Sequence, residues 1–152
     1  MGKSMSSEIR ERLKAGLQAG DVFTVTRTFT EEDTWAFGEV SRDHNPVHYQ
    51  KNYAKNLNLQ DRICHGLLVG SMVTEIGGQL GCLATEMKFK FIQPVYFGDT
   101  IECNFTIMSI EDNYTANAFA EFFNQRGEKV LECEISGILP NQKGIELMKW
   151  GG

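Results

Sequence analysis

The sequence predicts an α+β fold in which an antiparallel sheet curls around one long buried helix. Residues 66–80 are apolar or small on nearly every helical face, which is typical of a helix that other structure surrounds. Four later segments alternate apolar with polar residues, as strands with one buried face do: residues 87–91, 101–107, 114–122 and 131–135. We expect these four strands to form a meander in chain order.

The start of the chain adds a helix and a strand. Ile9, Leu13 and Leu17 lie four apart among charged residues, and this single apolar stripe predicts a short surface helix within residues 8–19. Residues 22–29 are rich in threonine and other β-branched or aromatic residues, which favours a strand. The four alternating segments and this strand together give a sheet of five strands.

A second helix is expected to begin after Thr30 and to reach about Val40. Thr30 and Asp33 have the spacing of a capping box, and acidic side chains in the first turn suit the positive end of the helix dipole. We expect Trp35, Phe37 and Val40 to anchor this helix on the core.

A chain of 152 residues is long enough for one domain and too short for two of ordinary size. We expect residues 20–140 to form the domain. Residues 1–19 are then a tail with a short helix, and residues 141–152 are a C-terminal tail.

Charge and hydropathy exclude two classes of partner. The chain has 20 acidic and 15 basic residues, a net charge of −5, so nucleic acid is not an expected partner. No apolar run is long enough to span a membrane or to act as a secretory signal, and we expect a cytoplasmic protein.

The four cysteines lack a C-x-x-C pair and are expected to be reduced, structural thiols.

The densest polar cluster lies in residues 41–48, where Asp43 and His48 are five positions apart around Pro46. An acid and an imidazole in a constrained loop can hold and activate a water molecule between them. An alternative is purely structural: Asp43 caps the next turn and His48 packs beneath the loop. Spacing alone leaves both interpretations open.

A second candidate is the pair His65 and Gly66 at the start of the helix predicted over residues 66–80. First-turn amides have no intrahelical acceptor, so this position can offer an oxyanion site. The alternative is that Gly66 only permits close contact between helix and sheet.

Two further candidates are a metal site and a carboxylate on the predicted helix. Imidazole, thiolate and carboxylate groups suitable for zinc occur at Asp43, His44, His48, Cys64 and His65. No two-ligand motif joins them at close spacing, so we expect no metal. Glu75 on the buried helix can serve as a base, or can instead face a wet cleft or a partner subunit.

Three blocks of residues together resemble the MaoC-like, R-specific enoyl-CoA hydratase (hydratase 2) family of hot-dog proteins. They are Asp43-x-Asn45-Pro46-x-His48, then His65-Gly66, then Phe91-x-x-Pro94-Val95-x-x-Gly98-Asp99. The resemblance runs from about residue 20 to 140. It implies the hot-dog fold, in which a curled antiparallel sheet wraps a long central helix, and a homodimer or higher homo-oligomer.

The resemblance also implies a reaction in fatty acid metabolism. It is the addition of water to a trans-2-enoyl thioester, giving an (R)-3-hydroxyacyl thioester, or the reverse dehydration. Asp43 and His48 match the catalytic pair, the Gly66 N–H matches an oxyanion donor, and Asn45 matches a loop-shaping position. Thr74 matches a hydroxyl near the pair in some relatives. The implied substrate is an acyl-CoA or acyl-carrier-protein thioester, with no cofactor.

Two positions depart from the family pattern. Arg42 stands where relatives usually have glycine, and Gln50 stands where an acidic residue is common. Neither change removes a proton-transfer group.

Two alternatives to hydration stay open: a hot-dog acyl-CoA thioesterase that uses Glu75, and a non-catalytic module that binds acyl thioesters.

Overall fold

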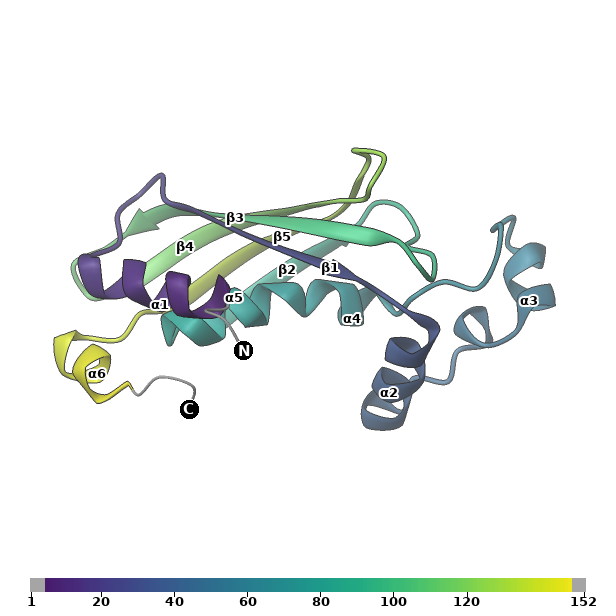
Figure 1. Ribbon diagram of the computed structural model, residues 1–152, viewed down its shortest axis with the longest axis horizontal. Coiled ribbons are helices and arrows are strands. Elements are labelled where there is room, and N and C mark those ends of the chain that lie inside the picture. The colour runs from purple at the N-terminus through teal and green to yellow at the C-terminus, as the bar shows by residue number, and fades with distance from the viewer. Residues whose placement is uncertain (1–4, 149–152) are drawn as a thin grey trace.

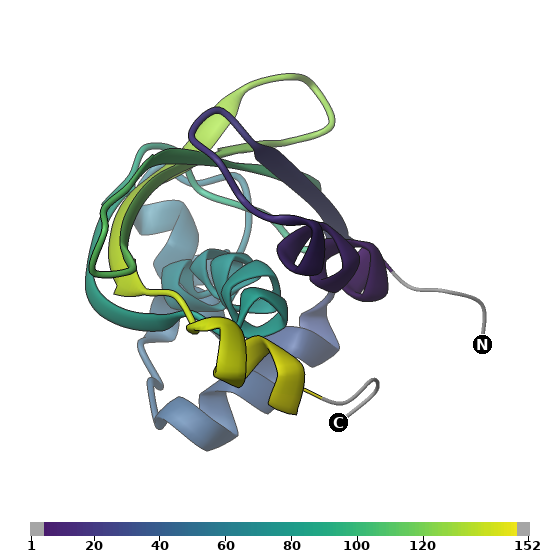
Figure 2. The same ribbon diagram turned by 90° about the vertical axis from the view of Figure 1, so that its left-hand side faces the viewer.

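The structure, a computed structural model, describes the backbone of residues 5–148 and the side chains of residues 8–148. A five-stranded sheet in the order β1-β3-β4-β5-β2 curves over two consecutive helices, α4 and α5 (Figures 1 and 2). All of its strand pairs are antiparallel. The predicted α+β class is therefore confirmed.

Seven helical segments and five strands follow one another in the described residues. The helices are α1 (Met5–Ala15), α2 (Glu31–Ser41), the 3-10 turn η1 (Pro46–His48), α3 (Lys51–Asn56), α4 (Gly66–Gly70), α5 (Met72–Leu80) and α6 (Gln142–Leu147). The strands are β1 (Val22–Thr28), β2 (Leu83–Phe91), β3 (Thr100–Ile110), β4 (Thr115–Phe123) and β5 (Lys129–Ile138). Helix α6 lies within the expected C-terminal tail, whose last four residues are outside the described part.

The expected meander of four strands is wrong in one respect. Strands β3, β4 and β5 do follow one another, but β2 pairs with β5 and not with β3. In this register Met87 lies opposite Ile135, and Phe89 lies opposite Cys133. Alternation along a strand determines which face is buried, but it carries no information on which neighbour the strand pairs with.

The predicted helix over residues 66–80 is present but divided at Ser71. The Ser71 N–H donates to the carbonyl of Leu67 at 2.9 Å, and its hydroxyl donates to the carbonyl of Leu68 at 2.6 Å. The expectation that the helix is buried on all sides is wrong. Leu67 is 57% exposed, and Thr74 and Glu75 are exposed, because the sheet and α1 cover only part of the helix surface (Figure 2).

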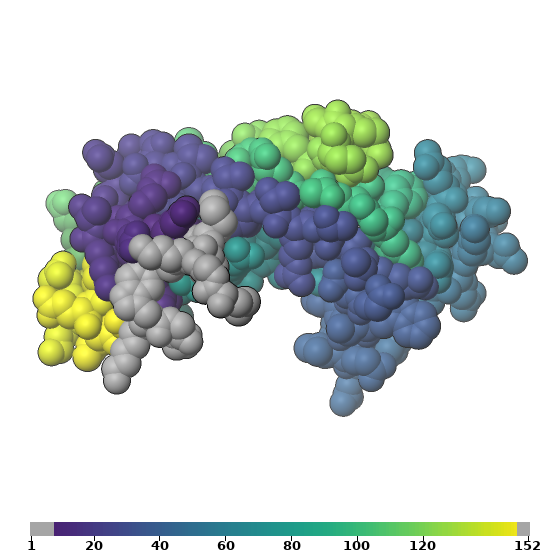
Figure 3. Space-filling model, viewed as in Figure 1, coloured from purple at the N-terminus to yellow at the C-terminus, as the bar shows by residue number. Residues whose placement is uncertain are grey.

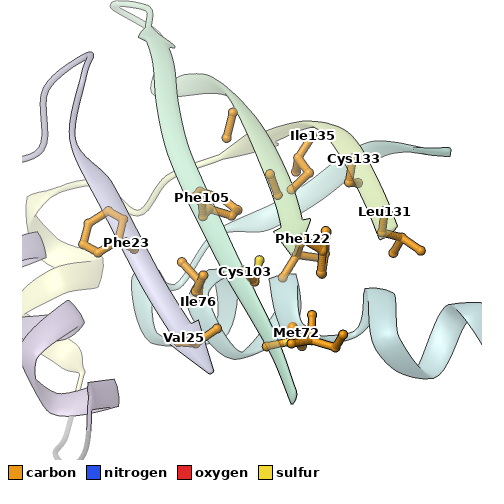
Figure 4. Packing of buried hydrophobic residues seen from close by; sticks show 14 of the residues in the cluster. Phe23, Val25, Met72, Ile76, Cys103, Phe105, Phe122, Leu131, Cys133 and Ile135 are labelled. Carbon is orange, nitrogen blue, oxygen red and sulfur yellow. The ribbon is translucent and has the colours of Figure 1, made fainter. Parts of the chain in front are cut away.

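The core lies between the concave face of the sheet and helices α4 and α5. Met72 and Ile76 lie under the inward side chains of Val25, Cys103 and Phe122 (Figure 4). Burial raises the pKa of the Cys103 thiol to about 12. All four cysteines are unpaired thiols.

Helix α1 packs against α5 and buries Ile9 and Leu13, which are 3% and 4% exposed. The predicted surface helix thus contributes to the core. Between residues 5 and 148, no helix combines the length and apolar character needed to cross a membrane.

Helix α2 begins with the predicted capping box: the Asp33 N–H donates to Thr30 Oγ1, and the Thr30 N–H donates to Asp33 Oδ2. Its expected anchors are only partly right. Phe37 packs against the core, but Trp35 and Val40 are 57% and 86% exposed. The buried positions are instead Thr34 and Gly38, which lie four apart and so share one helix face with Phe37.

Helices α2 and α3 project at one end of the molecule, away from α1 and α6 (Figures 1 and 3). The loop between α2 and α3 holds the polar cluster of residues 41–48. This arrangement brings that loop to the start of α4.

Candidate active site

A cavity of about 510 Å³ lies where the loop after α2 meets the start of α4 and the end of β2. Most of the side chains around it are apolar. Its lining comprises Asp43, His48, Leu59, Ile63, Cys64, His65, Gly66, Leu67, Val69, Phe91, Ile92, Gln93, Pro94, Val95 and Leu131. An apolar pocket with a few polar groups is typical of a site for a small organic ligand.

The loop that carries Asp43 is held by side chains that fold back onto its own backbone. The Asp43 N–H donates to the hydroxyl of Ser41, and the Asn45 N–H donates to Asp43 Oδ1, both at 3.1 Å. The Val47 N–H in turn donates to Asn45 Oδ1 at 3.1 Å. Such turns fix short polar loops. Asp43 and Asn45 thus both accept hydrogen bonds from backbone N–H groups of their own loop.

The same fold brings Asp43 and His48 together. Oδ2 of Asp43 lies 3.9 Å from Nε2 of His48. The Asp43 side chain is 48% exposed, whereas that of His48 is 8% exposed. The carboxylate thus remains open to solvent and ligands, and the imidazole is held inside the protein.

The tautomer of the neutral His48 ring follows from its other nitrogen. Nδ1 lies 2.8 Å from the carbonyl oxygen of Ile63. A carbonyl can only accept, so Nδ1 carries the hydrogen and Nε2 holds the lone pair. The basic nitrogen of His48 therefore faces the Asp43 carboxylate.

Burial lowers the pKa of His48 below its ordinary value of 6.5. The nearby His65 lowers this pKa further, and the Ile63 carbonyl and the Asp43 carboxylate partly offset both effects. A lowered pKa keeps His48 unprotonated at neutral pH, which is the form that can accept a proton.

His65 also contacts both members of the pair. Its ring stacks on that of His48 with the centroids 3.8 Å apart and the planes at 29°. Its Nε2 lies 2.9 Å from the carbonyl oxygen of Asp43 and so carries the hydrogen. The sequence did not indicate this contact of His65, because nothing local shows that it meets a residue 22 positions earlier.

Gly66 lies where the start of α4 meets the end of β2. A Cβ atom on Gly66 would lie 2.6 Å from a ring carbon of Phe91, so only glycine allows β2 to pack this closely on α4. Gly66 also lines the cavity. Its N–H belongs to the first turn of α4, where the helix itself offers no acceptor.

A model of the MaoC like domain matches residues 16–119 of this chain. The chain belongs to the MaoC-like domain family. Among curated relatives, it is similar to a mitochondrial 3-hydroxyacyl-(acyl-carrier-protein) dehydratase of Arabidopsis thaliana, with 33% identity over 84% of this chain and 81% of that protein. It is 26% identical to an (R)-specific enoyl-CoA hydratase of Rhodospirillum rubrum, over 82% of this chain and 89% of the other.

Solved structures give the same result for the fold. The unliganded R-hydratase of Pseudomonas aeruginosa matches with a TM-score of 0.77 and 26% identity, over 84% of this chain and 85% of that one. The (R)-hydratase of A. caviae involved in PHA biosynthesis matches with a TM-score of 0.76 and 26% identity, over 82% and 98%. The resemblance to the MaoC-like, hot-dog family is confirmed.

The MaoC-like chain does not bring Thr74 to the cavity. Thr74 is exposed, its hydroxyl donates to the Ser71 carbonyl at 2.6 Å, and it is absent from the cavity lining of the described chain. Glu75 is likewise exposed and outside this lining.

Arg42 takes a backbone conformation that suits glycine better than a residue with a side chain. Arg42 ends α2 in the left-handed conformation, with φ 59° and ψ 25°. Glycine adopts this conformation without the steric cost that a side chain incurs. The turn into the Asp43 loop therefore forms in this chain, but with a less suitable residue.

One group of side chains has the donors of a metal site: Asp43, His48 and His65 offer ligand atoms within 4.8 Å of one another. The arrangement fits a metal poorly. Nε2 of His65 donates its hydrogen to the backbone carbonyl of Asp43, so this nitrogen has no lone pair to offer a metal ion. The absence of a metal remains a prediction.

Proposed function

We propose that this MaoC-like protein adds water to a trans-2-enoyl thioester to give an (R)-3-hydroxyacyl thioester, and catalyses the reverse dehydration. One observation carries the proposal. The lone pair on His48 Nε2, fixed by the Ile63 carbonyl, faces Asp43 Oδ2 at 3.9 Å beside an apolar cavity. A buried base and an open carboxylate at this separation suit the activation of one water molecule.

In the proposed step, a water oxygen about 2.8 Å from both Nε2 and Oδ2 bridges the pair. His48 accepts a proton from this water while the oxygen forms a bond to C3. The electron pair of the C2–C3 double bond moves toward the thioester carbonyl. The Asp43–His48 pair then returns the proton taken from water to C2. The elements of water are thus added without oxidation, reduction or a cofactor.

The transition state places negative charge on the thioester oxygen, which a hydrogen-bond donor can stabilise. The N–H of Gly66 is the proposed donor. It lies in the first turn of α4, and its residue lines the same cavity as Asp43 and His48. Phe91 and Val69 line this cavity with apolar side chains, which favours an apolar acyl chain over a charged ligand.

The carrier of the acyl group is proposed from the relatives. The proteins similar to this chain include an (R)-specific enoyl-CoA hydratase and a 3-hydroxyacyl-(acyl-carrier-protein) dehydratase. We propose a thioester of coenzyme A or of acyl carrier protein as the substrate.

The two alternatives have less support. The thioesterase alternative depends on Glu75 on the central helix, but Glu75 is exposed and outside the cavity lining. A non-catalytic binding module has no need for a base whose ring nitrogen is held in the reactive tautomer. The Asp43–His48 geometry therefore favours hydration.

The test is incubation of the full chain with crotonyl-CoA. Absorbance of the conjugated thioester and free thiol are followed in parallel, and the chirality of the product is determined. Hydration predicts loss of absorbance without thiol release and an (R)-3-hydroxy product. Thiol release would favour the thioesterase, and an (S) product would contradict the proposed placement of water.

We also propose a homodimer that forms along β2. This strand is at the edge of the sheet, so one side of its backbone lacks a partner strand in the single chain. Leu83 and Phe91 on this strand are 72% and 54% exposed. An isologous contact would cover both the unpaired backbone and these side chains.

A further inference from the structure

His65 is almost fully buried, at 1% exposure, and contacts both members of the proposed catalytic pair. We propose that His65 is a positioning residue, which holds the backbone of Asp43 through its Nε2–H and the ring of His48 by stacking. This inference rests on the proposed hydration reaction. It adds a third side chain that fixes the geometry of the pair without itself exchanging a proton.

Hydrogen bonds engage two of the three oxygen atoms of Asp43, its Oδ1 and its carbonyl oxygen. Its Oδ1 accepts from the Asn45 N–H, and its carbonyl oxygen accepts from His65 Nε2–H at 2.9 Å. The hydroxyl of Tyr49 approaches the same carbonyl oxygen at 3.5 Å. With these contacts in place, Oδ2 is the oxygen that faces His48. The His65 hydrogen bond fixes the backbone from which that carboxylate extends.

The ring of His48 is held at one edge and on one face. Nδ1 is fixed by the Ile63 carbonyl at 2.8 Å, and the face of the ring lies against His65 with the centroids 3.8 Å apart. One hydrogen bond leaves a ring free to rock about that bond, whereas a stacked neighbour restricts this motion. The Phe37 ring also packs near His65, with their centroids 5.0 Å apart.

Electrostatics adds to this positioning. Two imidazolium ions with centroids 3.8 Å apart would repel each other, and His65 contributes to the lowered pKa of His48. Among the described residues, the titratable groups next to His48 are Asp43 from the loop after α2, Tyr49 after η1, and His65 before α4. Of these, Asp43 raises the pKa of His48 and His65 lowers it.

A competing interpretation is that His65 only fills the core. Its Nδ1 is buried without a hydrogen-bond partner among the described residues, so the polar ring is costly if packing is its only role. A leucine would fill similar space without that cost. Packing alone therefore predicts that an apolar replacement preserves turnover.

The experiment compares three variants of the full chain with crotonyl-CoA as substrate. His65→Leu removes both contacts. His65→Gln keeps a donor nitrogen at the same distance along the side chain but loses the stacked ring. Phe37→Leu is the matched control, because it alters packing against His65 and leaves both contacts in place.

We expect His65→Leu to lower kcat about 10²-fold and to change KM by less than about threefold. Displacement of the reacting groups slows the chemical step more than it weakens substrate binding. His65→Gln should recover at least about tenfold of this loss, and Phe37→Leu should change the melting temperature more than kcat. In NMR titrations without substrate, the midpoint of His48 should rise in His65→Leu.

Wild-type kcat in folded His65→Leu would overturn the proposal, as would a His65→Gln variant no more active than His65→Leu. An unchanged His48 titration midpoint in His65→Leu would also overturn it. These results differ from a failure of the proposed reaction, which would show as a lack of hydration by the wild-type chain.

Discussion

Oδ2 of Asp43 and Nε2 of His48 are 3.9 Å apart, too far for a direct hydrogen bond and close enough for one water molecule to bridge them. The two groups face each other because separate contacts fix them: Asp43 by its own loop and His48 by the carbonyl of Ile63. Contacts within the protein therefore set the geometry of the pair.

Removing either titratable group should abolish most turnover while preserving the fold. Asp43→Asn keeps an oxygen that can accept from the Asn45 N–H, and His48→Asn keeps a nitrogen that can donate to Ile63. Each variant should lower kcat by roughly 10²–10⁴-fold with little change in melting temperature. The double variant should be hardly slower than the slower single variant, since both groups act on one water. Near-normal turnover in either single variant would contradict the assignment.

The pH profile of hydration should report the lowered pKa of His48. Protonation removes the lone pair that accepts the proton from water, so kcat/KM falls on the acid side. Because burial lowers this pKa from 6.5, the midpoint of the acid limb should lie below 6.5. An acid limb with a midpoint above 6.5 would show that another group controls the profile.

The same shift links pH to stability. His48 takes up a proton at a higher pH in the unfolded chain than in the folded chain. Its contribution to the free energy of unfolding is therefore present above the unfolded pKa and is lost as pH falls through the folded pKa. Urea unfolding at a series of pH values measures this loss. His48→Asn should reduce the slope in that range.

Gly66→Ala should destabilise the protein by about 1–3 kcal/mol, because the added Cβ would lie 2.6 Å from the Phe91 ring. Phe91→Leu in the same chain should recover part of this loss by removing the ring atoms that clash. Urea unfolding of the two single variants and the double variant gives the coupling free energy. Strict additivity of the two losses would contradict the close contact.

Arg42→Gly should stabilise the protein by about 0.5 kcal/mol, because glycine has no side chain to strain the left-handed backbone at φ 59°. The larger conformational entropy of glycine in the unfolded chain offsets part of this gain. Turnover should stay within about twofold of the wild type. Arg42→Ala is the control, because alanine keeps the Cβ that causes the strain. Equal stability changes in the two variants would show that strain at this turn is not limiting.

Light scattering should give about 34 kDa, twice the 17.1 kDa of the chain. Leu83→Lys places a charge on the exposed edge strand β2, and we expect it to shift the protein toward monomer. Val40→Lys is the control, because Val40 is 86% exposed on α2, which is not part of the sheet. A wild-type monomer at micromolar concentration would contradict pairing along β2.

Several features of this protein were determined by local sequence. The alternating strands, the Thr30–Asp33 capping box and the buried face around Met72 depend on residues within a few positions of one another. The sequence also indicated that Asp43 and His48 lie close together, because Asn45 and Pro46 constrain the short loop between them.

Tertiary structure alone decided the rest. The pairing of β2 with β5, the exposure of Leu67 and the contact of Phe91 with Gly66 depend on segments distant in the chain. The hydrogen bond from His65 to the Asp43 carbonyl spans 22 positions. Periodicity specifies which face of an element is apolar, but only the folded chain determines which other element covers that face and which side chains meet there.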